Sequence, residues 1–428
     1  MPEGMLLMPF RLYIDPGTGS MLFTILVGLL SALLFVGKKA LVRIQFLAHG
    51  GNVRKSNLDT EKKAFVIFSD HKRYWNVFRP VCDEFEKQKT DLFYLTCSPD
   101  DPVLSADYTH IHASFIGEGN AAFAKLNLLQ ADIVLSTTPN LDVYQWKRSK
   151  GVRYYVHILH APNDPNMYNM FGLDYYDAVL LSGKYQEKQI RDLERLRSLP
   201  EKELVFIGLT YLDEVAKRLK ARRKEENETP AGKKKTILVA PSWGVNSLLH
   251  RFGKPLLEAL RETGCHVIVR PHPQMLVNEK EFMADLQTAF PADDSFEWNT
   301  DNDNFEALYR ADLLISDFSG IIFDFVLAFD KPLIYTDTEF DDARLDCWWV
   351  EETPWTFQVL PKIGRVLKEE NLSQIGTVIE TCLTDESFAE ARKQAREETW
   401  MHRGEAAKRC VSYLLEKHEA LREKERKL

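Results

Sequence analysis

Residues 311–335 read ADLLISDFSGIIFDFVLAFDKPLIY, and this segment indicates the fold class of the chain. Two short apolar runs, Leu313–Ser316 and Pro332–Tyr335, have the length and composition of buried strands. A small polar turn and a helical segment lie between them. Parallel strands need a crossover of this kind, because a tight turn can join only antiparallel strands. The segment therefore predicts one β–α–β unit of a parallel sheet.

The same alternation of apolar runs and amphipathic segments extends in both directions. It predicts further strands at 64–69, 91–96, 133–137, 154–160, 178–181, 205–207, 236–240 and 266–270. Between the sixth and seventh of these, six basic residues in 217–224 precede a stretch with Pro and Gly that ends any helix. Acidic residues are mixed in and no aromatics interleave, so a solvated linker is favoured over a nucleic-acid or lipid patch.

The chain is therefore predicted to be an α/β protein with two domains of similar size. We place an N-terminal domain at 60–215, a charged linker at 216–235, a C-terminal domain at 236–415 and a charged helical tail at 416–428. The formal net charge of -8 over 428 residues excludes a globally basic protein that coats nucleic acid. Six widely spaced cysteines form neither a Cys-x-x-Cys pair nor a zinc-type cluster, which favours a reducing compartment such as the cytosol.

One segment differs in composition from the rest of the chain. Residues 21–37 carry no charge and are followed at once by lysines, which is typical of a transmembrane helix; a buried core helix or a signal peptide is less favoured. Residues 1–45 are thus predicted to be a membrane anchor with a basic collar. Because residues 38–55 hold five Lys/Arg and no acid, the positive-inside rule places the rest of this single-pass protein in the cytoplasm. The collar could also lie on an anionic membrane surface.

Ligands of open parallel sheets bind beyond the carboxyl ends of the strands, so the residues that follow each strand are the candidates for a site. The run Arg270-Pro271-His272-Pro273 follows one strand, and its prolines stiffen the backbone. Arg270 and His272 are two residues apart on an extended segment and so face the same side, where they offer two donors to one phosphate. The alternative is a surface loop with an incidental histidine.

Two further turns could bind an anion through backbone N–H groups. In the turn after residue 240, Ser242 and Gly244 could form such a site, although core packing explains this turn equally well. After residue 316, Ser319 and Gly320 open a helix, where N–H groups face outward.

Two aspartates flank this second turn. Asp317 would repel a phosphate, so it is expected to cap the turn, to bind a ribose hydroxyl or to orient His272. Asp324 lies two helical turns further on, where a contact with a substrate hydroxyl and a plain helix-surface position are equally favoured.

His160 is the candidate general base of the first domain. It ends the strand expected at 154–160, and a cleft histidine there could take a proton near neutral pH. A capped structural histidine is the alternative.

The motifs LVAPSWG, IVRPHPQ, ADLLISDFSGIIFDFVLAFDKPLIY and MHRGEAAKR, in this order over residues 236–413, resemble the CDP-glycerol:poly(glycerophosphate) glycerophosphotransferases of teichoic-acid and capsule synthesis. The resemblance implies two Rossmann-like domains of the GT-B type at the inner face of the membrane. It implies transfer of glycerol phosphate from CDP-glycerol, or a related CDP-polyol, to a polyol-phosphate or lipid-linked acceptor, with release of CMP. That activity is a phosphotransferase for substituted phosphate groups, acting in cell-envelope synthesis.

Carried over to this chain, the resemblance makes Arg270 and His272 contacts of the donor phosphates and places Ser319 and Gly320 at the phosphate-binding helix. His160 would be the base that activates the acceptor hydroxyl, although Ala161 and Pro162 stand where the family has Gly and a small hydroxyl residue.

No Asp-x-Asp pair sits at a strand end, so we expect no essential metal and no cofactor besides the co-substrate. A nucleic-acid partner is not expected. The alternatives to the leading hypothesis are a GT-B glycosyltransferase that uses a nucleotide sugar and a non-catalytic, membrane-tethered nucleotide-binding protein.

Overall fold

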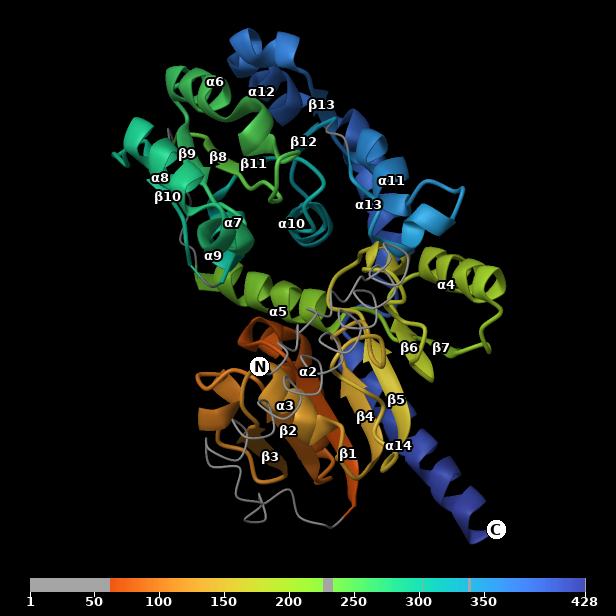
Figure 1. Cartoon of the computed structure of the whole chain (residues 1–428). Coiled ribbons are helices and arrows are strands. Elements are labelled where there is room, and N and C mark those ends of the chain that lie inside the picture. Colours follow the sequence, from red (N-terminus) through yellow and green to blue (C-terminus); the bar gives the residue numbers. More distant parts are fainter. Residues whose placement is uncertain (1–61, 226–233, 302, 338–339, 428) are drawn as a thin grey trace, which may run out of the picture. The chain divides into compact units, whose positions relative to one another are not determined.

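A computed structural model describes residues 62–225, 234–301, 303–337 and 340–427 (Figure 1). The expected anchor at 1–45, with its helix at 21–37, lies outside the described residues. Within the described ranges, no helix combines the length and the apolar character that a membrane crossing needs.

The first sheet contains seven parallel strands in the order β3-β2-β1-β4-β5-β6-β7. Its strands are β1 (Lys63–Ser69), β2 (Leu92–Thr96), β3 (Ile111–Phe115), β4 (Ala131–Ser136), β5 (Val152–Ile158), β6 (Ala178–Leu181) and β7 (Glu203–Phe206). The order reverses between β1 and β4, which makes the carboxyl ends of these two strands the place where a ligand is expected.

The second sheet contains six parallel strands in the order β10-β9-β8-β11-β12-β13. Its strands are β8 (Thr236–Val239), β9 (His266–Val269), β10 (Phe296–Trp298), β11 (Leu313–Ser316), β12 (Leu333–Thr336) and β13 (Arg365–Leu367). The β–α–β unit expected from residues 311–335 is confirmed, because β11 and β12 pair in parallel with Leu314 opposite Leu333.

Helices connect the strands of both sheets. The α-helices are α2 (Trp75–Lys87), α3 (Gly119–Leu126), α4 (Lys184–Arg197), α5 (Thr210–Glu225), α6 (Leu248–Glu262), α7 (Pro273–Asn278), α8 (Lys280–Ala289), α9 (Phe305–Arg310), α10 (Ile321–Phe323), α11 (Trp355–Ile363), α12 (Ile375–Thr384), α13 (Ala389–Thr399) and α14 (Ala406–Arg426). A π-helix, η4 (Asp324–Phe329), continues α10 directly. Short 3₁₀ helices are η1 (Lys72–Tyr74), η2 (Pro102–Ser105), η3 (Pro165–Met167), η5 (Asp346–Trp349), η6 (Glu369–Gln374) and η7 (Glu386–Phe388).

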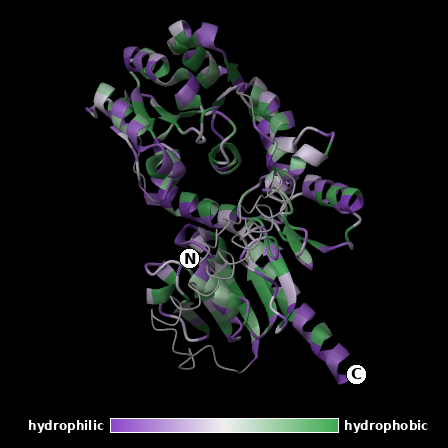
Figure 2. Cartoon of the chain, in the orientation of Figure 1, coloured by the Kyte–Doolittle hydropathy of each residue, from purple (hydrophilic) through white to green (hydrophobic). Residues whose placement is uncertain are grey.

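The central strands of both sheets, such as β1, β4, β8 and β11, are buried on their two faces, as in parallel sheets with helical crossovers, whereas the edge strand β3 is largely exposed. Figure 2 shows the strands largely in the colour of hydrophobic residues, whereas most helices mix both colours. The four residues of β8 and the four of β11 are all buried. Because the strands are buried, the polar side chains that could contact a ligand lie in the loops at the strand ends.

The structure adds three strands to those expected from the sequence. Strands β3, β10 and β13 were not predicted, because they are short and carry polar or charged residues. The helix α5 continues to Glu225, in the residues expected as a charged linker. Most of the tail expected at 416–428 is the end of α14, a helix from Ala406 to Arg426 whose Cys410, Val411 and Leu414 pack in the core of the first sheet. The domain bounds stay predictions.

Two buried carboxylates connect residues 345–356 to the segment between β5 and β6 of the first sheet. Asp346 accepts hydrogen bonds from the N–H groups of Phe171 (2.7 Å) and Gly172 (3.1 Å). Asp164 accepts from the N–H groups of Trp355 (2.7 Å) and Thr356 (3.0 Å). These bonds hold loops of the two sheets together near the strand ends that carry the candidate residues.

Candidate active site

His160 lies just beyond the carboxyl end of β5 and is partly buried. Its Nδ1 is 3.0 Å from the Thr137 hydroxyl, and its ring centre is 5.0 Å from that of Tyr74. Within the described ranges, no protein group hydrogen-bonds to Nε2, which leaves this nitrogen for a ligand. Burial lowers the pKa of His160 to about 4, and the positive charge of Arg73 contributes to the shift. The expectation that His160 titrates near neutral pH is therefore wrong. The ring is neutral at pH 7, which is the form that a general base requires.

His272 caps the N-terminus of α7. Its Nδ1 accepts a hydrogen bond from the Gln274 N–H at 3.1 Å, so this nitrogen carries no proton. Burial lowers the pKa of His272 to about 4, again with a contribution from Arg73. In the resulting neutral ring the proton sits on Nε2, which makes this nitrogen a hydrogen-bond donor. The geometry thus suits His272 to donate to a phosphate oxygen and not to remove a proton.

Arg270 is held by the loop after β10. Its guanidinium donates to Asn299 Oδ1 and, at 2.7 Å, to the carbonyl oxygen of Asp301. Burial lowers the pKa of Arg270, but an arginine stays charged near neutral pH.

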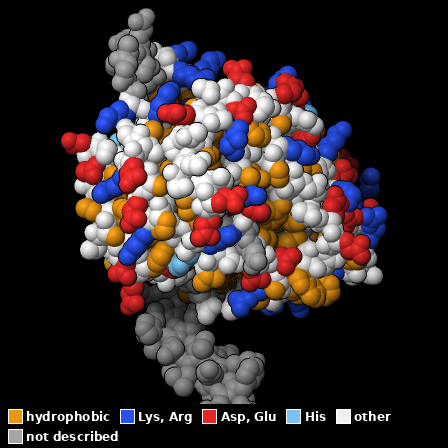
Figure 3. Space-filling view, turned by 90° about the horizontal axis from the view of Figure 1, so that it is seen from above, with side chains coloured by type: hydrophobic (Ala, Val, Ile, Leu, Met, Phe, Trp, Pro, Cys, Tyr) orange, Lys and Arg blue, Asp and Glu red, His pale blue; other side chains and the backbone are white. Residues whose placement is uncertain are grey.

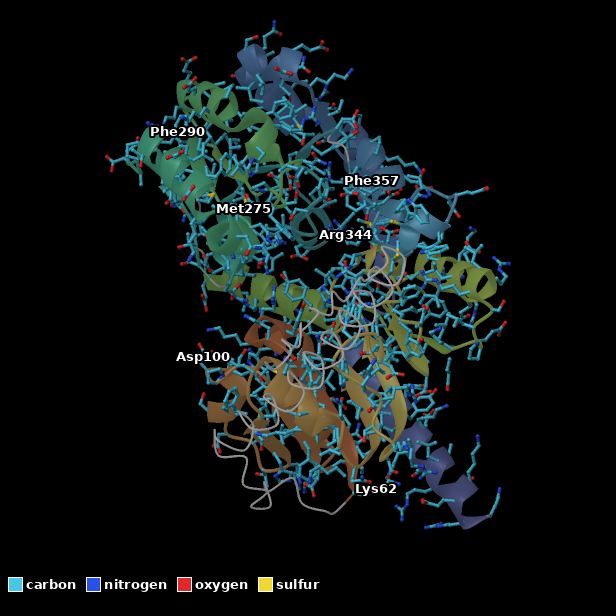
Figure 4. All side chains as sticks on the ribbon, in the orientation of Figure 1. Lys62, Asp100, Met275, Phe290, Arg344 and Phe357 are labelled. Atoms are coloured by element: carbon cyan, nitrogen blue, oxygen red, sulfur yellow. The ribbon has the colours of Figure 1, made fainter. Side chains whose placement is uncertain are left out.

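Arg270 also lines a cavity of about 440 Å³ between loops of the two sheets. In Figure 4, Asp100, which follows β2, and Met275, on α7, mark the parts of the chain that supply these loops. The lining residues are His71, Lys72, Arg73, Trp75, Asn76, Pro102, Arg270, Pro271, Pro273, Gln274, Leu276, Val277, Asn299, Thr300, Asp301 and Asp303. The cavity is large enough for part of a nucleotide-sized ligand.

Asp317 joins two loops of the second sheet. Its buried carboxylate accepts from the N–H groups of Leu248 (2.9 Å), Phe318 (2.7 Å) and Ser319 (3.1 Å) and from both the N–H and the hydroxyl of Ser242. The expected capping role is confirmed by these contacts. The expectation that the Ser319 N–H faces outward is wrong, because this group donates to Asp317.

The donors of the turn after β8 are also engaged. Ser242 gives its N–H and hydroxyl to Asp317, and the Gly244 N–H donates to Glu279 Oε1 at 2.8 Å. Gly320, by contrast, is exposed, and a Cβ built on it meets no atom within 4 Å. The turn after β11 is therefore the more open of the two, and donor binding by Ser242, Gly244, Ser319 and Gly320 stays a prediction.

Asp324 begins the π-helix η4 and is buried. Its Oδ2 accepts from the Tyr211 hydroxyl at 3.0 Å and from Asn304 Nδ2 at 3.3 Å. Burial raises the pKa of Asp324 to about 7. The helix-surface interpretation is wrong, because the carboxyl faces Tyr211 on α5 and not solvent. A substrate contact stays a prediction.

The sequence reading missed the loop after β1, where Asp70, His71, Lys72 and Arg73 follow a buried strand. Burial raises the pKa of Asp70, and its buried Oδ1 has no hydrogen-bond partner among the described residues. A run of four ionisable residues at the carboxyl end of a strand was the available signal.

The charged side chains on the surface are of both signs. On the face shown in Figure 3, acidic and basic side chains are interspersed. In the described part of the chain, no group of three or more His, Cys, Asp or Glu side chains could hold a metal ion. The expectation that no metal is essential stays a prediction.

The two parallel sheets define a GT-B-like α/β fold, which is shared with solved structures of low sequence identity. UDP-GlcNAc 2-epimerase from Methanocaldococcus jannaschii, solved with UDP-GlcNAc and UDP, has a TM-score of 0.54 at 13% identity and covers 83% of this chain and 100% of its own. The enzyme from Neisseria meningitidis, bound to UDP-GlcNAc, has a TM-score of 0.54 at 15% identity with the same coverage. S. aureus MnaA with UDP has a TM-score of 0.51 at 14% identity and covers 83% and 97%.

The chain belongs to the CDP-Glycerol:Poly(glycerophosphate) glycerophosphotransferase family, whose model matches residues 173–415. This match includes Arg270, His272 and the turn after β11 and confirms the resemblance noted from the motifs. The family supports a nucleotide-linked transferase as the general activity. No curated protein sequence matches the chain.

Proposed function

We propose that this protein transfers glycerol phosphate from CDP-glycerol, or a related polyol phosphate from its CDP ester, to a hydroxyl of a polyol-phosphate or lipid-linked acceptor. The observation that carries the proposal is the pair of neutral histidines, His160 after β5 and His272 before α7, in a chain of the glycerophosphotransferase family. His160 has its Nε2 open to accept a proton, and the Nε2–H of His272 is available to donate a hydrogen bond.

In the proposed reaction, His160 Nε2 takes the proton of the acceptor hydroxyl. The oxygen then forms a bond to the distal phosphorus of the donor, the one that carries glycerol. The bond from this phosphorus to the bridging oxygen breaks, and CMP leaves with the bonding electrons. His272 and Arg270 donate hydrogen bonds to phosphate oxygens and stabilise the charge that moves to CMP. This scheme needs no metal, in line with the sequence-based expectation.

Attachment to the cytoplasmic face of a cell membrane is part of the proposal. It rests on the uncharged segment 21–37 and its basic flank alone. A cytoplasm-facing site would have access to CDP-linked donors and to lipid-linked acceptors on an anionic surface.

The decisive test is CMP release from CDP-glycerol by the purified full chain, with and without a glycerol-phosphate oligomer as acceptor. We expect acceptor-dependent release that His160→Ala lowers by at least 10²-fold, since a positioned base contributes about 10²–10⁴-fold. Turnover with UDP- or GDP-sugars alone would identify a glycosyltransferase instead. Binding of CDP-glycerol without CMP release under any condition would identify a non-catalytic nucleotide-binding protein.

A further inference from the structure

Arg73 is placed at the cavity by the fold of the loop after β1. His71 Nδ1 accepts the Arg73 N–H at 3.1 Å and so caps η1. The Arg73 guanidinium carbon then lies 5.5 Å from the ring centre of Tyr74, whose ring centre is 5.0 Å from that of His160. The Arg73 side chain thus comes from the first sheet, beside the candidate base, and lines the same cavity as Arg270 of the second sheet.

The Arg73 guanidinium is exposed, and among the described residues no carboxylate or other acceptor hydrogen-bonds to it or forms an ion pair with it. Its neighbours differ in this respect, since Lys72 pairs with Asp100 and Arg270 is bonded to Asn299 and Asp301. Five N–H donors in a planar fork suit a phosphate or carboxylate ligand. Burial raises the pKa of the nearby Asp70 carboxyl and the charge of Arg73 acts to lower it, but no hydrogen bond or ion pair between the two is formed in the described part of the chain. Unlike Lys72 and Arg270, Arg73 therefore keeps its N–H donors available for an anion.

The positive charge of Arg73 also reaches both histidines. It lowers the pKa of His160, which follows β5, and the pKa of His272, which follows β9. A group that influences both rings lies where the acceptor side and the donor side of the site come together. This relation supports the inference, which stands on the cavity and on the unpaired guanidinium.

We propose that Arg73 binds the phosphoryl group that is transferred and stabilises its oxygens while the acceptor oxygen attacks. This role rests on the proposed function and extends it with a ligand from the first sheet. Arg73 neither gives nor takes a proton, because its guanidinium stays charged. It holds two non-bridging oxygens of the distal phosphate, while the P–O bond to the acceptor forms and the P–O bond to CMP breaks.

The kinetic test compares Arg73→Ala and Arg73→Lys with Arg195→Ala, an exposed arginine of α4 that pairs with Asp192. We expect Arg73→Ala to lower kcat for CMP release by at least 10²-fold, because a single arginine on a transferring phosphoryl group is worth about 10³–10⁵-fold elsewhere. Arg73→Lys keeps the charge but not the fork and should recover part of this loss. Equal kcat values for Arg73→Ala and Arg195→Ala would overturn the proposal.

A binding test separates this inference from the proposed function. Calorimetric titration with inorganic pyrophosphate needs no knowledge of the nucleotide or the acceptor. We expect at least tenfold weaker binding by Arg73→Ala than by the wild type or Arg195→Ala, with thermal unfolding unchanged. If the wild type released no CMP from CDP-glycerol, this loss would still support an anion site at Arg73. Unchanged pyrophosphate binding would refute the Arg73 site even in an enzyme that uses CDP-glycerol.

Discussion

The Ser242 hydroxyl lies 2.8 Å from Asp317 Oδ2, and this contact joins the loop after β8 to the turn after β11. Asp317 accepts three further N–H groups from residues 248, 318 and 319. The carboxylate therefore works as the shared acceptor of two loops, and a ligand at either loop depends on it indirectly.

Replacing this acceptor should unfold the protein more readily. Asp317→Ala leaves several buried donors without an acceptor, so we expect a loss of about 3 kcal/mol in the free energy of unfolding. Ser242→Ala removes one hydroxyl and should cost about 1 kcal/mol. Urea unfolding of both variants measures the difference. A smaller loss for Asp317→Ala than for Ser242→Ala would contradict the role of Asp317 as the shared acceptor.

The rate of CMP release should depend little on pH across the range where free histidine titrates. Because the pKa of His160 and that of His272 are lowered to about 4, both rings are neutral from pH 8 to about pH 5, and kcat/KM should be level there. Below this range, protonation of the base removes activity. A fall centred near pH 6.5 would show that the pKa of His160 is not lowered.

The lowered pKa values of His160 and His272 should also make the protein less stable at acidic pH. The unfolded chain binds protons at these histidines near pH 6.5, above the pH at which the folded chain does. Stability from this source is therefore lost as the pH falls from about 6.5 to about 4.

Arg73→Ala removes a positive charge that lowers both pKa values, so the fall of its kcat/KM at acidic pH should lie at higher pH than that of the wild type. An unshifted fall would mean that Arg73 has no influence on the two rings.

Asp324 should make the protein less stable as the pH rises from about 4 to about 7. Its pKa is raised from 3.8 in the unfolded chain to about 7 by burial, so the folded state binds the extra proton and loses stability as the pH rises between these values. Asp324→Asn keeps an acceptor for Tyr211 without a charge. We expect this variant to gain about 2 kcal/mol over the wild type between pH 5 and pH 8. A gain that is the same at both pH values would contradict the raised pKa of Asp324.

Gly320→Ser should be tolerated. The φ of Gly320 is −57°, and a Cβ there meets no atom within 4 Å, so the change adds a hydroxyl without strain. We expect a melting temperature within a few degrees of the wild type and an equal or lower KM for the donor. Gly208→Ala is the contrasting variant, because its φ is +95° and the Cβ would lie 2.3 Å from the Met401 carbonyl oxygen. Its melting temperature should fall clearly, and similar values for both variants would contradict this account.

The sequence alone determined the periodic part of the fold. A mostly apolar run such as Leu313–Ser316 indicates a buried strand, because a strand of a parallel sheet is covered on both of its faces. The ends of the ten predicted strands agree with the structure within about two residues. The short strands β3, β10 and β13 were not predicted. Their composition does not indicate a strand, and they are strands because each pairs with a neighbouring strand.

The strand ends also pointed to the candidate residues, since the carboxyl edge of a parallel sheet is where the loops gather. His160 and His272 were found in this way. Their protonation states were not, because a pKa near 4 depends on burial and on the charge of Arg73, which lies far away in the sequence.

Only the tertiary structure decided which donors are free. The sequence offers Ser242 and, more strongly, Ser319 as anion-binding residues, but Asp317 accepts hydrogen bonds from both. The sequence likewise shows Arg73 as one basic residue among 55. Folding places it at a cavity beside Tyr74, and among the described residues no acceptor hydrogen-bonds to its guanidinium. The physical reason is that hydrogen-bond partners come from distant loops, and a local pattern cannot record them.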